Sequence, residues 1–326
     1  MTRDSVAVDE PVPGLFRLEE PDGERFVCQF VVAGERGALI VDSGLPGSPA
    51  RTILPLLEAL PQRPAELTLL LTHPDSDHCG GTAELRAARP DLQTVAHAAD
   101  CALLGDPERT ISERYERFAS SDGIALSAAA RDRARSRLGP PFRVGRPLAA
   151  EMELDLGGVA CHILHAPGHS AGHAAVWLPG QRAMIAGDAV MGSGIRKRDG
   201  SLLYAPQFLS PATYRRTIDR FGALGVDLLL CSHEPPMRGA AVEDFLAESG
   251  RAVDRLEGLT RDALARGADT LAGVCAAVHG AYGELPQGGA PDVASTVAGI
   301  LAELASSGEV TVDEDARPRT FRLEAA

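Results

Sequence analysis

The sequence predicts an α/β fold in which short buried strands alternate with helices. Apolar runs such as residues 38–41 and 67–71 have the length of buried strands, and polar residues bound them. Residues 50–60 instead place Leu54, Leu57 and Leu60 three positions apart, which is typical of one face of a helix. A hydrophobic content of 44% and a charged content of 24% are those of a folded globular protein.

Strand and helix patterns follow one another along most of the chain. In the first hundred residues, strands are expected at 26–32, 38–41, 67–72 and 94–96, and helices at 50–60 and 82–88. Later strand patterns cover 153–164, 174–185 and 226–231, with a helix at 212–223 before the last of them. This alternation is the basis of the α/β prediction.

Residues 102–141 interrupt the alternation with a charged, helical segment. Ile111, Tyr115 and Phe118 fall at i, i+4 and i+7, and a second helix is expected at 127–138, before a proline pair. We interpret the segment as a helical insertion. It could cap a functional site or be a surface excursion that packs elsewhere, and the sequence leaves both interpretations open.

Composition excludes several classes of function. The formal net charge of −13 disfavours nonspecific binding to nucleic acid or to an anionic membrane. No apolar run is as long as a membrane span, and the N-terminus has no signal-peptide core. The six cysteines show no paired spacing, which predicts buried free thiols. We therefore expect a cytoplasmic protein with no membrane partner.

The densest cluster of metal-binding side chains lies in residues 72–81, which read Thr-His-Pro-Asp-Ser-Asp-His-Cys-Gly-Gly. His73, Asp75, Asp77 and His78 come after an expected strand and before an expected helix. They therefore share one strand-to-helix turn, where neutral imidazoles and carboxylates can converge on a cation. The cluster predicts a metal site.

Other strand-like runs also end in short polar motifs. These are Val-Asp-Ser-Gly at 41–44, Pro-Gly-His-Ser-Ala-Gly-His at 167–173, Ala-Gly-Asp-Ala at 186–189 and Ser-His-Glu at 232–234. Together with 72–81, their order resembles that of the metallo-β-lactamase-fold hydrolases, whose signature is His-x-His-x-Asp-His followed by Gly-Gly. The resemblance covers roughly residues 14–237 and implies an αββα sandwich, with a catalytic domain at 1–238. Asp75 departs from the signature, because it stands where the second His is usual.

The resemblance also implies two divalent metal ions. The first would be bound by His73, Asp75 and His169, and the second by Asp77, His78 and His233, with Asp188 bridging the two. Zinc is the expected metal, although the carboxylate of Asp75 makes iron or manganese more plausible, because carboxylates suit harder ions. Asp42 and His173 are expected either to orient ligands through hydrogen bonds or to be purely structural.

The same resemblance implies a nucleophile made at the metals. A hydroxide shared by the two ions, next to Asp77 and Asp188, would attack the substrate. Tyr204 lies in the segment after Asp188 and could donate to an oxyanion. Arg196 and Lys197 in that segment could bind a substrate carboxylate or phosphate, or could be an ordinary solvated pair.

Residues 239–326 form a second predicted domain. Helices are expected at 242–266, 271–279 and 292–306, followed by a hairpin of 309–312 and 319–323. This order resembles the winged-helix module appended to some hydrolases of the fold. The helix at 292–306 holds no Lys or Arg, so we expect it to bind no nucleic acid. We expect it to pack on the catalytic domain or to form a homodimer.

Taken together, these features predict a binuclear metal-dependent hydrolase that acts on a carboxylic ester, thioester or lactone of a small molecule. One alternative is a phosphodiesterase or ribonuclease, because winged-helix relatives of the superfamily include nucleases. The acidic charge weighs against it. Another is a non-catalytic binding protein on the same fold, against which the complete ligand set argues.

Overall fold

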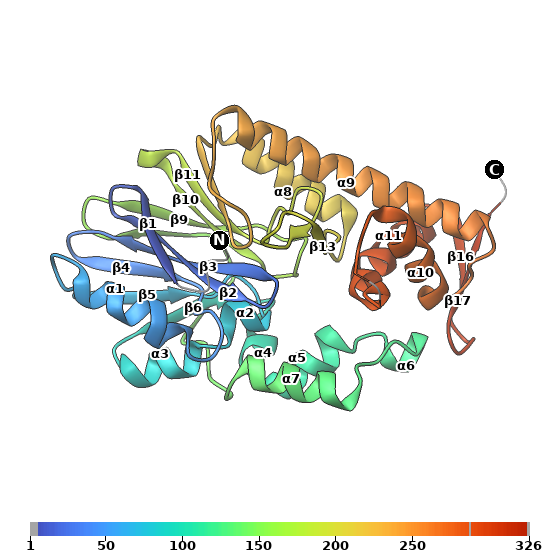
Figure 1. The fold of residues 1–326 in the computed structure, drawn as a ribbon, viewed down its shortest axis with the longest axis horizontal. Coiled ribbons are helices and arrows are strands. Elements are labelled where there is room, and N and C mark those ends of the chain that lie inside the picture. The colour runs from blue at the N-terminus through green and yellow to red at the C-terminus, as the bar shows by residue number, and fades with distance from the viewer. Residues whose placement is uncertain (1–5, 287, 325–326) are drawn as a thin grey trace.

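Two β-sheets form the centre of the computed structural model, which describes residues 6–286 and 288–324 (Figure 1). The seven-stranded sheet has the order β1-β2-β3-β4-β5-β6-β7 and consists of Ala7–Val12, Leu15–Asp22, Arg25–Ala33, Gly37–Val41, Glu66–Leu70, Gln93–His97 and Arg146–Leu148. The six-stranded sheet has the order β15-β14-β11-β10-β9-β8 and consists, in that order, of Met237–Arg238, Leu228–Cys231, Ala183–Gly187, Ala174–Leu178, Ala160–His165 and Met152–Asp155.

Helices cover the outer faces of both sheets (Figure 1). Beside the first sheet lie α1 (Leu54–Ala59), the short α2 (Ser76–Cys79) and α3 (Thr82–Ala88). Beside the second lie α8 (Pro211–Ala223) and the long α9 (Ala240–Ala265). A small hairpin of β12 (Ile195–Arg196) and β13 (Leu202–Tyr204) precedes α8.

Alternation of buried side chains along the strands produces the four layers. In β4, Leu39 belongs to the core between the two sheets, whereas Ile40 belongs to the core under α1 and α3. In β10, Val176 belongs to the inter-sheet core, whereas Trp177 belongs to the core that includes α8 and α9. Because successive strand residues point to opposite faces, each strand serves two cores. The αββα sandwich expected from the sequence is confirmed.

Several predicted elements are divided in the structure. The pattern at 153–164 is two strands, because Gly157 and Gly158 have φ of 87° and 82° and turn the chain between β8 and β9. The pattern at 174–185 is also two strands, with a short 3-10 turn at Pro179–Gln181. The predicted helix at 50–60 begins as a π-helical turn, Pro49–Ile53.

The insertion consists of short helices rather than two long ones. They are α4 (Cys101–Leu104), α5 (Pro107–Thr110), a π-helical turn (Ile111–Tyr115), α6 (Ala119–Asp122) and α7 (Ala128–Leu138). Only α7 matches a helix expected from the sequence, and Ser127 begins it by accepting a hydrogen bond from the N–H of Ala130. In Figure 1, α5–α7 lie to one side of the sandwich, facing the C-terminal elements.

The C-terminal elements are α10 (Leu271–Tyr282), α11 (Ala294–Ser306), β16 (Val310–Asp313) and β17 (Thr320–Leu323), and α9 leads into them (Figure 1). Val297 and Ile300 of α11 are buried in the same core as Phe208 and Tyr214. A Cβ on Gly299 would lie 2.4 Å from the Leu209 carbonyl oxygen, so α11 approaches the chain before α8 closely.

The expected packing of α11 on the rest of the chain is confirmed, whereas the division into two domains at residue 238 stays a prediction. None of the helices within the described residues is long and apolar enough to cross a membrane. The six cysteines, all described, are free thiols, and five of them are buried.

Candidate metal centre

The predicted ligands lie at or just beyond the ends of strands, at one edge of the sandwich. The loop with His73, Asp75, Asp77 and His78 follows β5, and Asp188 follows β11. His233 follows β14, and His169 lies in the turn between β9 and β10. Segments far apart in sequence therefore meet at this edge, as the sequence predicted.

Each of the four histidines is held through its Nδ1 atom. His73 Nδ1 lies 2.9 Å from Thr72 Oγ1, and His78 Nδ1 lies 2.7 Å from Asp42 Oδ2. His169 Nδ1 lies 2.9 Å from the Gln207 carbonyl oxygen, and His233 Nδ1 lies 2.8 Å from the Phe26 carbonyl oxygen. Carboxylate and carbonyl oxygens can only accept, so at least three of these Nδ1 atoms donate and their Nε2 atoms keep a free lone pair when the ring is neutral. Within the described residues, the buried Nε2 atoms of His73 and His78 have no hydrogen-bond partner. Unsatisfied buried nitrogens of this kind fit a metal ion.

The ligand atoms form three overlapping groups, in each of which all atoms lie within 4.8 Å of one another. The groups are His73, Asp75 and His169; His73, His78 and Asp188; and Asp77, His78 and His233. Asp188 Oδ2 lies 4.0 Å from His73 Nε2 and 3.5 Å from His78 Nε2. It also lies 3.4 Å from His233 Nε2. The Asp188 carboxylate is therefore shared between the two sides of the cluster.

The charges of these groups suit cation binding. Burial, together with the neighbouring His78, lowers the pKa of His73 to about 4, so this imidazole is neutral at pH 7. Burial acts to raise the pKa of Asp77, but the Arg25 guanidinium outweighs it and holds that pKa below its usual range. Burial also opposes ionisation of Asp188, yet His233 and His78 hold its pKa well below the usual range.

Two arginines that the sequence did not single out bind the carboxylates. Arg114 Nε lies 2.6 Å from Asp75 Oδ1, and its Nη2 lies 2.7 Å from Asp75 Oδ2 and 3.1 Å from His169 Nε2. Arg25 Nη2 lies 2.6 Å from Asp77 Oδ2, and its Nη1 lies 3.4 Å from His233 Nε2. Each guanidinium thus supplies positive charge to one carboxylate and reaches one histidine.

Arg114 changes the interpretation of Asp75. The sequence indicated only that the Asp75 carboxylate would favour harder ions. In the structure the Arg114 guanidinium pairs with that carboxylate and offsets its negative charge. Neither arginine could be found from its local pattern, since Arg25 lies at the start of a strand and Arg114 in a turn of the insertion.

Asp42 and His173 both make hydrogen bonds with candidate ligand residues. Asp42 accepts hydrogen bonds from the N–H and the hydroxyl of Thr72, as well as lying against His78 Nδ1. Asp42 has a φ of 64°, which is rare for a residue other than glycine. The N–H of Asp188 donates to His173 Nε2 at 3.2 Å. Contacts of this kind are the ones by which neighbouring residues orient metal-binding side chains.

The segment after Asp188 lies beside Arg25. The Arg25 guanidinium stacks on the Tyr204 ring, with its carbon 5.7 Å from the ring centroid. Burial raises the pKa of Tyr204, so its hydroxyl stays protonated. Lys197 Nζ lies 2.9 Å from Glu24 Oε1, and Arg196 donates to Ser193 Oγ and the Gly200 carbonyl. Lys197 and Arg196 therefore have partners within the protein.

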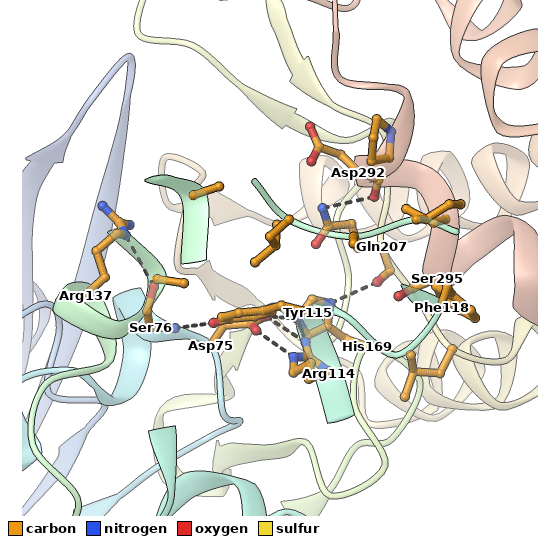
Figure 2. A pocket seen from close by; sticks show the side chains of 18 of the residues that line it. Asp75, Ser76, Arg114, Tyr115, Phe118, Arg137, His169, Gln207, Asp292 and Ser295 are labelled. Atoms are coloured by element: carbon orange, nitrogen blue, oxygen red, sulfur yellow. Dashed lines mark hydrogen bonds and ion pairs between the residues drawn. The ribbon is translucent and has the colours of Figure 1, made fainter. Parts of the chain in front are cut away.

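A cavity of about 370 Å³ opens beside the Asp75 side of the cluster (Figure 2). Its lining includes Asp75, Ser76 and His169 from the sandwich, Arg114, Tyr115, Phe118, Ile124, Leu126, Arg133 and Arg137 from the insertion, Gln207 and Phe208 from the segment before α8, and Asp292 and Ser295 from the C-terminal part. The Tyr115 hydroxyl accepts a hydrogen bond from the N–H of Ser76 at 3.1 Å. The insertion therefore caps the site and is not a surface excursion.

The C-terminal hairpin holds the insertion over this cavity. Arg319 binds the fully buried Asp122 of α6 through Nη2 and Oδ2 at 2.6 Å, and the N–H of Arg319 donates to the Ser121 carbonyl. Three parts of the chain thus enclose one cavity beside the candidate metal centre.

The sequence is similar to known proteins over most of the sandwich. The sequence model of the Metallo-beta-lactamase superfamily matches residues 22–233. A hydroxyacylglutathione hydrolase from Methylococcus capsulatus is 29% identical over 218 residues, which cover 65% of this chain and 67% of that protein. An atrochrysone carboxyl ACP thioesterase from Pseudocercospora fijiensis is 27% identical over 193 residues, which cover 58% of this chain. The match spans only 45% of that thioesterase.

Solved structures share the fold along nearly the whole chain. A metallo-beta-lactamase family protein from Thermus thermophilus superposes with a TM-score of 0.72 at 22% identity, covering 97% of this chain and 100% of that one. A beta-lactamase domain protein from Burkholderia ambifaria superposes with a TM-score of 0.70 at 18% identity, covering 97% of this chain and 93% of that one. The chain belongs to the metallo-beta-lactamase superfamily.

Proposed function

We propose that the chain is a binuclear hydrolase of carboxylic esters, lactones and above all thioesters of small molecules. The observation that carries this proposal is the convergence of four histidine Nε2 atoms, each ring held through Nδ1, on three ionised carboxylates. Thioesters are favoured because two of the relatives are named as a hydroxyacylglutathione hydrolase and an acyl-carrier-protein thioesterase.

The residues fit two divalent ions, with zinc expected and iron or manganese as the alternatives. His73, Asp75 and His169 would hold one ion, Asp77, His78 and His233 the other, and Asp188 would contact both. Bound ions would lower the pKa of coordinated water and stabilise negative charge on the carbonyl oxygen. For metal to reach His169 and His233, the N–H groups of Arg114 and Arg25 must give up their contacts with the Nε2 atoms.

The side chains of this protein supply positioning and proton transfer. Asp77 and Asp188 are ionised and can accept hydrogen bonds from the attacking water. Tyr204 stays protonated beside Arg25 and would donate to the oxyanion. In the overall reaction, the hydroxyl of water joins the acyl carbon, the bond from that carbon to sulfur or oxygen breaks, and the remaining proton passes to the leaving group.

The C-terminal part is proposed to enclose the cavity and not to bind nucleic acid. Val297, Ile300, Leu301 and Leu304 of α11 are buried in the core shared with the hydrolase region, so the helix in the recognition position has no apolar face left for another partner. Each fully buried side chain of this size contributes about 1.5–3 kcal/mol. A homodimer remains part of the proposal, and the interface would lie elsewhere.

The proposal is tested by a substrate panel with matched metal controls. Protein loaded with zinc, iron or manganese is assayed against acyl-glutathione and other thioesters, aryl esters, lactones, a β-lactam, a phosphodiester and RNA. The expected result is metal-dependent hydrolysis of thioesters, abolished by a chelator and restored by metal. Cleavage of the phosphodiester or RNA, with the carboxylic substrates untouched, would contradict the proposal and favour the nuclease alternative.

A further inference from the structure

One face of α7 forms a wall of the cavity beside the candidate metal centre. Ala130, Arg133, Ala134 and Arg137 all line the cavity, and their spacing of three and four residues places them on the same face of the helix. The alanines leave room beside the helix, and the two arginines place positive charge at the wall. This face therefore gives the cavity wall a small apolar surface and two guanidinium groups, of which that of Arg137 is already bound by Asp22 and Ser76.

Among the described residues, only one of the four arginines of α7 is left without an acidic partner. Arg131 pairs with Glu116, Arg135 with Glu108 and Asp132, and Arg137 with Asp22. Arg114, the other cavity-lining arginine, is engaged by Asp75. Within residues 6–286 and 288–324, no ion pair or hydrogen bond is made by the Arg133 side chain, although it lines the cavity. Its guanidinium is thus free to bind a ligand.

The rest of the lining indicates what kind of ligand fits. Phe118, Ile124, Leu126 and Phe208 supply an apolar surface, whereas Asp75 and His169 mark the end at the candidate metal centre. A volume of about 370 Å³ is that of a pocket for a small organic molecule. Asp292 lies in the part of the cavity wall that comes from the C-terminal elements. Its carboxylate would repel an anionic group of the ligand, which would therefore bind near Arg133.

We propose that Arg133 binds an anionic group of the substrate and so sets its specificity. The substrate would be an ester or thioester whose apolar body carries a carboxylate or a phosphate. A planar guanidinium can bind either group through two parallel hydrogen bonds. This inference rests on the proposed function for its reacting bond, but the anion site itself depends only on the cavity and its charges.

Kinetics on paired substrates test the inference. The pair consists of a phenylalkanoyl thioester with a para-carboxylate and the same thioester with a para-carboxamide. We expect the wild-type protein to prefer the carboxylate. Arg133→Ala should remove that preference by raising KM about 10-fold or more, with kcat little changed. Arg133→Lys should keep part of it. Arg135→Ala, on the outer face of α7, is the matched control and should leave the preference intact.

Binding of ligands that cannot be hydrolysed separates this inference from the proposed function. Calorimetry on the metal-loaded protein compares 3-phenylpropionate and phenyl phosphate with 3-phenylpropionamide. Arg133→Ala should weaken binding of one or both anions about 10-fold, and which anion responds identifies carboxylate or phosphate as the recognised group. Equal affinities in wild type, Arg133→Ala and Arg135→Ala would overturn the inference. Absence of all hydrolysis would overturn the proposed function while this binding difference still decides the anion site.

Discussion

The two halves of the candidate metal centre are anchored to different parts of the chain. In the half that contains Asp75, the carboxylate is bound by Arg114, which comes from the helical insertion. In the half that contains Asp77, the carboxylate is bound by Arg25, which lies at the start of β3 in the sandwich. Arg25 Nη2 also lies 3.1 Å from Asp22 Oδ2, whereas within the described part of the chain the only ion pair of Arg114 is the one with Asp75.

The Asp75 half therefore depends on a single ion pair, whereas in the Asp77 half the arginine has a second carboxylate partner. Both guanidiniums are largely buried, with 13% of each side chain exposed. Removing the partner of a buried charge is costly when nothing else compensates that charge. Asp75 therefore joins the loop after β5 directly to the cap through one ion pair. Asp77 belongs to a network of Arg25 and Asp22 in the sandwich, which reaches the cap only at its far end, where Asp22 pairs with Arg137 of α7.

The largest expected effect comes from the residue that both halves share. Asp188→Ala should lower kcat about 10³-fold or more and remove at least one metal ion per chain, because it removes the carboxylate proposed to contact both ions. Steady-state kinetics and elemental analysis measure the two effects. Asp199→Ala, an exposed carboxylate in the following segment, is the control. Unchanged kcat in Asp188→Ala would mean that the two halves do not work as one centre.

The next effect separates the halves directly. In metal-free protein, Asp75→Asn should lower the free energy of unfolding by about 3 kcal/mol, since Arg114 loses its one carboxylate. Asp77→Asn should cost only about 1 kcal/mol, since Arg25 keeps Asp22. Denaturant unfolding in the presence of a chelator gives both values. Adding Arg114→Gln to Asp75→Asn should recover part of the loss. If Asp75→Asn and Asp77→Asn lowered the free energy of unfolding equally, the two halves would not differ in how their arginines are compensated.

A third effect concerns the Asp77 half alone. Tyr204→Phe keeps the ring on Arg25 but removes the hydroxyl, so a donor to the oxyanion would be lost. We expect kcat to fall about 10²-fold, with the metal content and the free energy of unfolding nearly unchanged. Kinetics with a thioester substrate and elemental analysis measure this. An unaltered kcat would leave Tyr204 as a residue that only packs against Arg25.

The smallest expected effect is on metal preference in the Asp75 half. Asp75→His should retain metal binding but shift the preference toward zinc over iron or manganese by about tenfold, or ~1.4 kcal/mol, because imidazole replaces a harder anionic ligand. Competition titrations measure the ratio of affinities. The matched substitution Asp199→His should leave this ratio of affinities unchanged. An unchanged metal preference in Asp75→His would mean that Asp75 only pairs with Arg114 and does not bind the metal.

The sandwich and the polar residues at the ends of its strands could be predicted from the sequence. Continuous apolar runs and the polar residues that follow them are local patterns, so β4, β5 and the loop with His73 could be predicted. The partners of that loop could not. Arg114 pairs with a residue 39 positions away, and no periodicity in the insertion encodes that contact. The sequence also could not predict which face of α7 lines the cavity, because arginines lie on both its cavity face and its outer face.

Metal titration of the wild-type protein beside its two half-site variants tests the binuclear centre most directly. Metal-free protein is titrated with zinc, and bound metal and thioester hydrolysis are followed together. We predict about two ions per wild-type chain, about one in Asp75→Ala and about one in Asp77→Ala, with full hydrolysis only in the wild type. A stoichiometry that neither substitution changes, or full hydrolysis by the metal-free protein, would contradict the binuclear centre.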